Sequence, residues 1–200
     1  MTHYTEKKFN IPELKGISRK TIEEHLKLYA GYVKNVNLMY DKLTEYMADS
    51  EKHALALGEI QRRFSFEWNG MRNHEHYFSL LEGGPKTLSE TGSGAELKKA
   101  LAAEFGSFEK WLATFKAIAL TRGIGWAMLY SDTATQKPVH AWVEEQHLGQ
   151  LNGAKLILGL DMWEHSYYLD YIPADKKKYI EAFFENLNWG VVERNFEKMA

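Results

Sequence analysis

One helical pattern dominates the start of the chain: residues 21–47 read TIEEHLKLYAGYVKNVNLMYDKLTEYM. Their apolar residues recur in steps of three and four, at positions 22, 26, 29, 33, 36, 40, 43 and 47. This spacing predicts one long amphipathic helix, because residues three and four apart share a helical face. Thr21 and Glu24 have the spacing of a capping box, so we expect the helix to begin there.

A second helical pattern covers about residues 54–81, with apolar residues at positions 57, 60, 64, 71, 78 and 81. Two long helices in sequence predict an antiparallel helical hairpin. The glycine-rich stretch 83–94 that follows is the clearest linker in the chain. We therefore expect an N-terminal hairpin domain at residues 1–84 and a second domain at residues 85–200.

The second half combines short helices with strands. Ser93 and Ser107 are each expected to begin a helix, the first reaching Phe105. Alternation or short apolar runs then predict three strands, at residues 126–131, 139–145 and 156–160, before helical patterns return at the end. The expected class is α+β: a long helical hairpin followed by an α/β domain with a small three-stranded antiparallel sheet flanked by helices.

The composition limits which partners and which metal ligands are possible. The chain has 200 residues and a net charge of −2, which gives no support to a nucleic-acid or basic membrane-binding surface. It has no cysteine, so disulfides, iron–sulfur clusters and thiolate ligands are excluded, and any metal must sit on His, Asp or Glu. No apolar run is long enough to span a membrane, and we expect a cytoplasmic protein.

Three places carry candidate ligands. Asp161 and His165 leave the end of the third predicted strand, His74 lies on the apolar face of the second helix, and His25 lies on the first helix. Each histidine taken singly is explained as a packed core residue, and His76 is expected to be exposed. Together, three imidazoles and one carboxylate form a set that suits iron or manganese.

At this point the sequence resembles the iron/manganese superoxide dismutase family over nearly its whole length. Asp161-x-Trp163-Glu164-His165-x-Tyr167-Tyr168 resembles the family's C-terminal signature. Four shorter motifs follow the family's order: Tyr32-Val33-x-Asn35-x-Asn37, Asn73-His74, Gly125-Trp126-Ala127 and Asn188-Trp189. The resemblance implies that the chain converts superoxide to dioxygen and hydrogen peroxide, cycling one manganese or iron ion per subunit between trivalent and divalent states.

The resemblance also implies roles for individual residues. It makes His25, His74, Asp161 and His165 the metal ligands, and Tyr32 the gateway tyrosine of a hydrogen-bond relay. Trp126 and Trp163 would wall the pocket. Glu164 and Tyr168 would act across a subunit interface, so a homodimer or homotetramer is implied.

The identity of two site residues stays open: the relay residue and the metal ligand on the first helix. Counting back from Asp161 without gaps puts the relay glutamine at Gln146, and a slip of one residue puts His147 there instead. On the first helix, seven residues separate His25 from Tyr32 where the family usually has eight, so Glu24 is the alternative ligand. Tyr29 stands where the family often has a gateway histidine, which could alter proton delivery.

The resemblance bears on the choice of metal at three positions. Gly70, Gly159 and a relay residue at Gln146 are the manganese-type choices in the family, so manganese is favoured over iron. The run Lys176-Lys177-Lys178 is interpreted as a solvated helix start, with attraction of the anionic substrate as the alternative. Two other functions remain: a metal-binding relative with little turnover, and a di-iron carboxylate protein, for which only Glu144-x-x-His147 fits.

Overall fold

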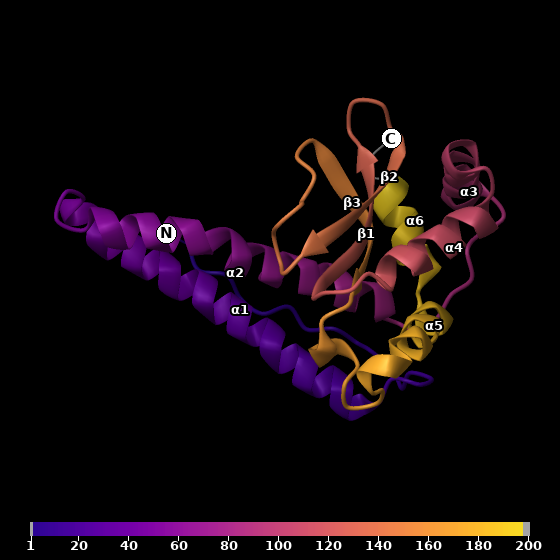
Figure 1. Ribbon diagram of the computed structural model, residues 1–200, viewed down its shortest axis with the longest axis horizontal. Coiled ribbons are helices and arrows are strands. Elements are labelled where there is room, and N and C mark those ends of the chain that lie inside the picture. Colours follow the sequence, from indigo (N-terminus) through magenta and orange to yellow (C-terminus); the bar gives the residue numbers. More distant parts are fainter. Residues whose placement is uncertain (1, 198–200) are drawn as a thin grey trace.

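A long helical hairpin projects from the rest of the molecule in the computed structural model, which describes residues 2–197 (Figure 1). Its arms are α1 (Arg19–Tyr46) and α2 (Ala54–Leu81), joined through the short 3-10 turn Met47–Asp49. The predicted second helix and the hairpin are confirmed. The remaining helices are α3 (Gly92–Phe105), α4 (Phe108–Ala119), α5 (Lys176–Asn186) and α6 (Trp189–Glu197).

The sheet has three antiparallel strands in the order β2-β1-β3. They are β1 (Gly125–Asp132), β2 (Pro138–Glu144) and β3 (Ala154–Asp161). The register places Trp126 of the central strand opposite Asp161 on one side and Val143 on the other. The α+β class and the three-stranded antiparallel sheet predicted from the sequence are therefore confirmed.

The core lies where α2 packs on β3 and where α4 and α6 pack on the sheet. Large aromatic side chains fill it, because a buried ring removes a large apolar area from water. The fully buried ones include Tyr77, Phe78, Trp111, Phe115, Trp126, Tyr179 and Phe183. This packing fixes α2 against the end of β3, which is where two of the candidate ligands lie.

The predicted starts of two helices were wrong. Helix α1 begins after Ser18, whose hydroxyl accepts the N–H of Thr21 at 3.2 Å. Thr21 does not cap the helix, because its own hydroxyl donates to Asp170 at 2.6 Å. Helix α3 begins after Thr91 rather than at Ser93, and no side chain caps it. Ser107 caps α4 as expected, by accepting the N–H of Lys110.

Other boundaries differ by a residue or two. Strand β2 stops at Glu144, because Glu145 has φ +51° and cannot continue an extended strand. Met47, assigned to the apolar face of the first helix, lies beyond it in the 3-10 turn and is 61% exposed. None of the helices described in residues 2–197 is both long and apolar enough to cross a membrane. The domain boundary after residue 84 stays a prediction.

Candidate metal centre

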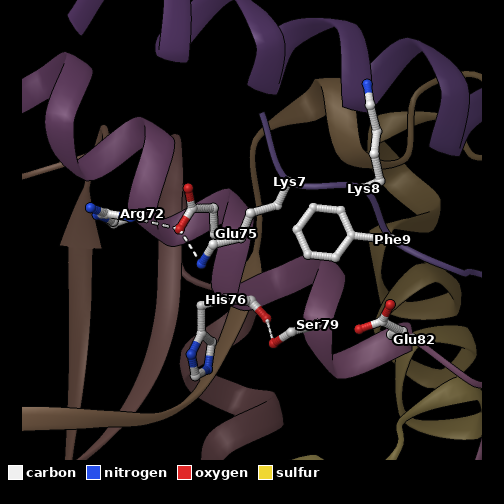
Figure 2. A pocket seen from close by; sticks show the side chains of 8 residues that line it. All are labelled: Lys7, Lys8, Phe9, Arg72, Glu75, His76, Ser79 and Glu82. Atoms are coloured by element: carbon white, nitrogen blue, oxygen red, sulfur yellow. Dashed lines mark hydrogen bonds and ion pairs between the residues drawn. The ribbon is translucent and has the colours of Figure 1, made fainter. Parts of the chain in front are cut away.

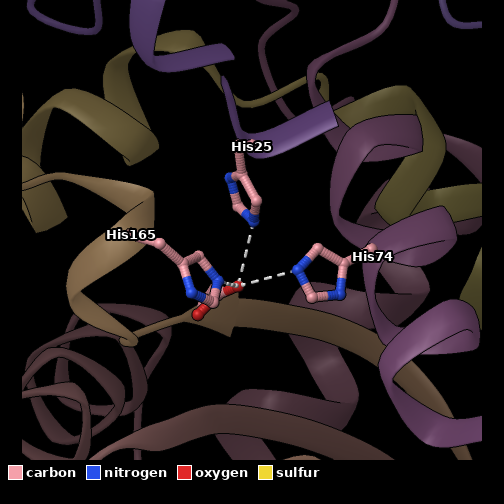
Figure 3. A group of neighbouring side chains, drawn as sticks. His25, His74 and His165 are labelled. Atoms are coloured by element: carbon pink, nitrogen blue, oxygen red, sulfur yellow. Dashed lines mark hydrogen bonds and ion pairs between the residues drawn. The ribbon is translucent and has the colours of Figure 1, made fainter. Parts of the chain in front are cut away.

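Four side chains from separate parts of the chain meet in the interior. His25 comes from α1, His74 from α2, Asp161 from the end of β3, and His165 from the 3-10 turn Glu164–Ser166. One candidate ligand atom from each lies within 4.8 Å of the other three. Figure 3 shows the three imidazoles pointing toward one another from three segments. These are the four residues for which the resemblance implied metal binding.

One oxygen of Asp161 is the point on which the imidazoles converge. Its Oδ2 lies 3.1 Å from Nε2 of His25, 3.2 Å from Nε2 of His165 and 3.6 Å from Nε2 of His74. The other oxygen, Oδ1, accepts the backbone N–H of Trp163 at 2.8 Å. The carboxylate is therefore oriented by the backbone through one oxygen and presents the other to the histidines.

His74 shows how an imidazole of the cluster is held in the tautomer that can bind a metal ion. Its Nδ1 lies 2.6 Å from the carbonyl oxygen of Gly70, four residues earlier in α2. A carbonyl only accepts, so Nδ1 carries the proton and Nε2 carries a lone pair. That Nε2 atom is buried and, among residues 2–197, has no hydrogen-bond partner. Since buried polar atoms are normally paired, a lone pair facing three other ligand atoms fits a cation.

The charges of the four side chains favour binding of a cation. Burial lowers the pKa of His74 to about 3 and also lowers the pKa of His25, so both rings are neutral at pH 7. Burial alone would raise the pKa of Asp161, but the neighbouring His165 and His25 outweigh it and hold the pKa below its ordinary value. A buried carboxylate beside neutral imidazoles is a negatively charged donor set, suited to iron or manganese.

A hydrogen-bond relay leads from the sheet to the cluster. Trp126 Nε1 donates to Gln146 Oε1 at 3.0 Å, and Gln146 Nε2 donates to Tyr32 Oη at 3.0 Å. An indole N–H only donates, so this contact fixes which end of the amide faces Tyr32. The Tyr32 ring in turn lies against His74, with ring centroids 5.0 Å apart. The structure thus brings Gln146, and not His147, into hydrogen-bond contact with Tyr32.

His147 lies beside this relay. Its ring meets Phe66 edge to face, with centroids 5.7 Å apart, and its Nδ1 is 3.9 Å from a carboxylate oxygen of Glu145. Phe66 also neighbours Tyr32 and Trp163, at 6.0 and 6.4 Å between centroids. We name this group of Tyr32, Phe66, His147 and Trp163 the aromatic rim.

Gly70 makes room for the ring of Tyr32. A Cβ atom at position 70 would lie 2.4 Å from Cδ1 and 2.5 Å from Cε1 of Tyr32, closer than real contacts allow. The ring therefore packs directly on the backbone of α2. Any side chain at this position, including a relay glutamine, would have to displace Tyr32.

Tyr29 and Glu24 do not join the cluster. The Tyr29 hydroxyl donates to Glu75 at 3.2 Å and accepts the backbone N–H of Lys7, and burial raises the pKa of Tyr29 to about 12. Its partner Glu75 lies in a surface cavity of about 560 Å³, where Arg72 and Lys7 also bind its carboxylate (Figure 2). Glu24 is half-exposed and pairs with Lys27. The shortened spacing on α1 thus directs His25, and not Glu24, inward.

The expectation that His76 is exposed was wrong. The side chain is half-buried, and desolvation lowers the pKa of its ring to about 4. The ring lies over β3, where a Cβ at Gly159 would come within 3.5 Å of His76 Cδ2. Gly159 thus lies next to a side chain of α2, two residues before Asp161, and a Cβ there would make only an ordinary van der Waals contact.

Two tryptophans cover the cluster. Trp126 meets His74 edge to face with centroids 5.2 Å apart, and Trp163 stacks on His165 at 5.5 Å with 19° between the planes. His165 is the least buried ligand, with 17% of its side chain exposed. Glu164 and Tyr168 are exposed on the surface next to it.

Two residues near the rim were missed by sequence reasoning. Phe66 lies four residues before Gly70 on α2, so helical spacing could have placed it on the face that meets Tyr32. Arg63 places its guanidinium carbon 3.5 Å from the centroid of the Phe66 ring. No sequence signal distinguished Arg63 from Arg62.

One family model and several known proteins are similar to this chain. Residues 93–195 match the family described as iron/manganese superoxide dismutases, C-terminal domain. The iron superoxide dismutase of Aquifex aeolicus is 34% identical over 191 residues, covering 92% of this chain and 86% of the relative. That of Cupriavidus metallidurans is 36% identical, covering 88% and 87%. The manganese superoxide dismutase of Mycolicibacterium paratuberculosis is 35% identical, covering 86% and 80%.

Proposed function

The chain belongs to the iron/manganese superoxide dismutase family, and from this we propose that it disproportionates superoxide at the cluster of His25, His74, Asp161 and His165. Two superoxide anions and two protons become dioxygen and hydrogen peroxide. The observation that carries the assignment is the buried lone pair of His74 Nε2, which faces three other ligand atoms. A manganese or iron ion held there would supply one-electron exchange between its trivalent and divalent states.

We propose that the surrounding residues supply protons and exclude water. Gln146 donates to the Tyr32 oxygen, so the hydroxyl hydrogen of Tyr32 stays free to point toward the cluster. Burial and the charge of Asp161 raise the pKa of Tyr32, so this phenol keeps its proton at neutral pH. Trp126 and Trp163 cover the imidazoles, which strengthens electrostatic interactions in the pocket.

Removal of a ligand tests the site. His74→Ala and Asp161→Ala are expected to abolish metal retention while the fold survives, because the helical hairpin and aromatic core do not depend on the ion. Metal content by elemental analysis and helical content by circular dichroism measure the two outcomes. His3→Ala is the matched control, since His3 is exposed and pairs only with Asp41. Full metal and activity in either ligand variant would refute the assignment.

We propose manganese as the preferred metal. Gly70 leaves the relay to Gln146, and Gly159 is the other feature that the resemblance associates with manganese-type members. Because the relatives include both iron and manganese enzymes, reconstitution must decide. Apoprotein is loaded separately with each metal, and turnover is measured per bound ion. Turnover about tenfold higher with iron, equivalent to about 1.4 kcal/mol in the barrier, would overturn the preference.

Two other functions make different predictions. A relative with little turnover would bind one ion per chain yet leave superoxide unchanged, and Tyr29 in place of a gateway histidine is the feature that favours it. A di-iron protein would bind two ions per chain and needs several glutamates together. Among residues 2–197, one candidate ligand group was found, and it contains a single carboxylate.

We also propose that the protein is a homodimer, or a homotetramer built from it. His165 is partly exposed, and among the described residues its Nδ1 has no hydrogen-bond partner. Glu164 is exposed beside it and forms no ion pair within that part of the chain. A second copy could therefore supply a carboxylate to this histidine. A cytoplasmic location stays a prediction, to be tested by cell fractionation.

A further inference from the structure

The loop that carries Gln146 is held by other side chains through its backbone. The carbonyl oxygen of Glu145 accepts the indole N–H of Trp163 at 3.0 Å. The next carbonyl oxygen, that of Gln146, accepts Asn73 Nδ2 at 3.0 Å and Gln150 Nε2 at 3.3 Å. A carbonyl oxygen has two lone pairs, so these two amides fill its capacity to accept hydrogen bonds. The backbone position of Gln146 is therefore set by Asn73 and Gln150.

The hydrogen bonds around Gln150 fix the orientation of its amide. Its nitrogen faces two acceptors, the Gln146 carbonyl oxygen and, at 3.3 Å, Oδ1 of Asn73. Its oxygen Oε1 accepts the hydroxyl hydrogen of Tyr130 on β1. A flipped amide would turn its oxygen toward two other oxygens, which cannot donate to it. Burial raises the pKa of Tyr130, so this phenol keeps the proton that it donates to Gln150.

The same network joins the loop to the helix that carries a candidate ligand. Asn73 is buried and directly precedes His74 on α2. The amides of Asn73 and Gln150 thus tie the Gln146 backbone to a helix that the core packing fixes. From this backbone, the Gln146 side chain places its Nε2 3.0 Å from the Tyr32 oxygen. A hydrogen bond weakens steeply as its angle is bent, so a small shift of the loop would weaken this contact.

We propose that Gln150 is a positioning residue: by holding the Gln146 carbonyl, it keeps the Gln146 amide within hydrogen-bond reach of Tyr32. The effect on turnover rests on the proposed function, because it needs Tyr32 to deliver protons at the neighbouring cluster. The placement of the amide can be measured separately. The indole N–H of Trp126 donates to Gln146 Oε1 and therefore reports where that amide lies.

The first test follows the Trp126 indole N–H by heteronuclear NMR, in full-length protein before metal loading. The variants are Gln150→Ala and Gln150→Glu, because a glutamate keeps the size of the side chain but has no N–H to donate at pH 7. Both should move the Trp126 signal and speed its exchange with deuterated water about three- to tenfold. Gln61→Ala, at an exposed position of the same helix α2, is the control and should leave the signal unchanged. An unchanged Trp126 signal in both Gln150 variants would overturn the proposal.

The second test measures kcat for superoxide per bound metal ion. Gln150→Ala should lower kcat about three- to tenfold at unchanged metal content, the range that the loss of one neutral hydrogen bond gives. Tyr130→Phe removes only the hydroxyl that orients Gln150 and should cause a smaller loss. The double variant should be no slower than Gln150→Ala, because Tyr130 acts through Gln150.

Three outcomes separate positioning from other roles of Gln150. A lower thermal stability of Gln150→Ala with normal kcat would mean that Gln150 only supports the fold, and would overturn the proposal. Losses in kcat that add up in the double variant would show that Tyr130 acts independently of Gln150, which also contradicts it. A loaded wild type without turnover would refute the proposed function, and the Trp126 signal would still decide whether Gln150 positions the amide.

Discussion

At the scale of single residues, one missing Cβ decides how the relay is built. Tyr32 packs on the backbone of Gly70, and from there its hydroxyl reaches Gln146. Gly70 also supplies the carbonyl that fixes the tautomer of His74. The same residue therefore fixes both where the Tyr32 hydroxyl lies and which nitrogen of His74 carries the lone pair.

Substitution of Gly70 tests this double role. Gly70→Ala should displace the Tyr32 ring, lower activity and destabilise the protein by about 1–3 kcal/mol, as overpacking does. Gly58→Ala is the matched control on the same helix, because nothing lies within 4 Å of its built Cβ. There the change should stabilise the protein by about 0.5–1 kcal/mol. Denaturant unfolding and turnover per metal ion measure both effects, and a neutral Gly70→Ala would contradict the contact.

A half-buried histidine outside the cluster makes stability depend on pH. His140 of β2 stacks on Phe105 with centroids 4.5 Å apart, and burial lowers its pKa to about 4 from the ordinary 6.5. Below pH 6.5 the unfolded chain binds this proton more readily than the folded chain. Stability should therefore be lost as the pH falls from 6.5 to about 4.

His140→Phe should flatten that part of the profile, because phenylalanine keeps the stacking and cannot be protonated. The difference in slope between wild type and variant should stay below about 1.4 kcal/mol per pH unit, since the ring is partly exposed. Unfolding free energies at several pH values measure it. If the unfolding free energies of wild type and His140→Phe changed with pH in parallel, the folded protein would tolerate the protonated ring of His140.

At the residue scale, motifs predicted which side chains come together, and their roles stay predictions, whereas the direction of some side chains was not predicted. The four residues that meet in the cluster were named from motifs, and Gln146 from an ungapped count. The partial burial of His76 was missed, because helical spacing assigns a face but cannot show that the side chain lies against β3. Arg63 and Arg62 look alike in sequence, and only the packing of Phe66 separates them.

At the scale of elements, apolar periodicity predicted the long helices, whereas the predicted starts of two helices were wrong. Apolar spacing of three and four predicted both long helices, because burial of one face stabilises them more than local propensity does. The start of α1 was misplaced because its capping depends on tertiary structure. The carboxylate of Asp170, far along the chain, accepts the hydroxyl hydrogen of Thr21. Ser18 therefore caps the helix instead.

The caps of two helices can be compared directly. Ser18→Ala should destabilise the protein by about 1 kcal/mol, because the N–H of Thr21 loses its acceptor. Thr91→Ala at the start of α3 should be nearly neutral, since the Thr91 side chain makes no capping hydrogen bond. Thermal and denaturant unfolding of both variants provide the comparison. Equal losses would show that the Ser18 hydroxyl does not stabilise α1.

At the scale of the whole molecule, the candidate metal cluster lies close to one surface. His25, His74 and Asp161 are fully buried, whereas His165 reaches that surface through the short turn after β3. Glu164 belongs to the same turn and is exposed. Association of two copies through this surface would therefore act on the metal directly, because a carboxylate bonded to a ligand histidine orients the ring and raises its basicity.

The last prediction follows from that coupling. Glu164→Ala should weaken the dimer and lower metal affinity about 10- to 100-fold, the usual effect of losing a partner of a ligand histidine. Sedimentation gives the association state, and metal analysis with turnover gives the site. Glu104→Ala on the α3 surface is the control, since its closest cation, Lys137, is 3.9 Å away. If Glu164 served only to join subunits, the variant would become a monomer with normal metal affinity. A dimer with unchanged metal content and turnover would remove Glu164 from both roles.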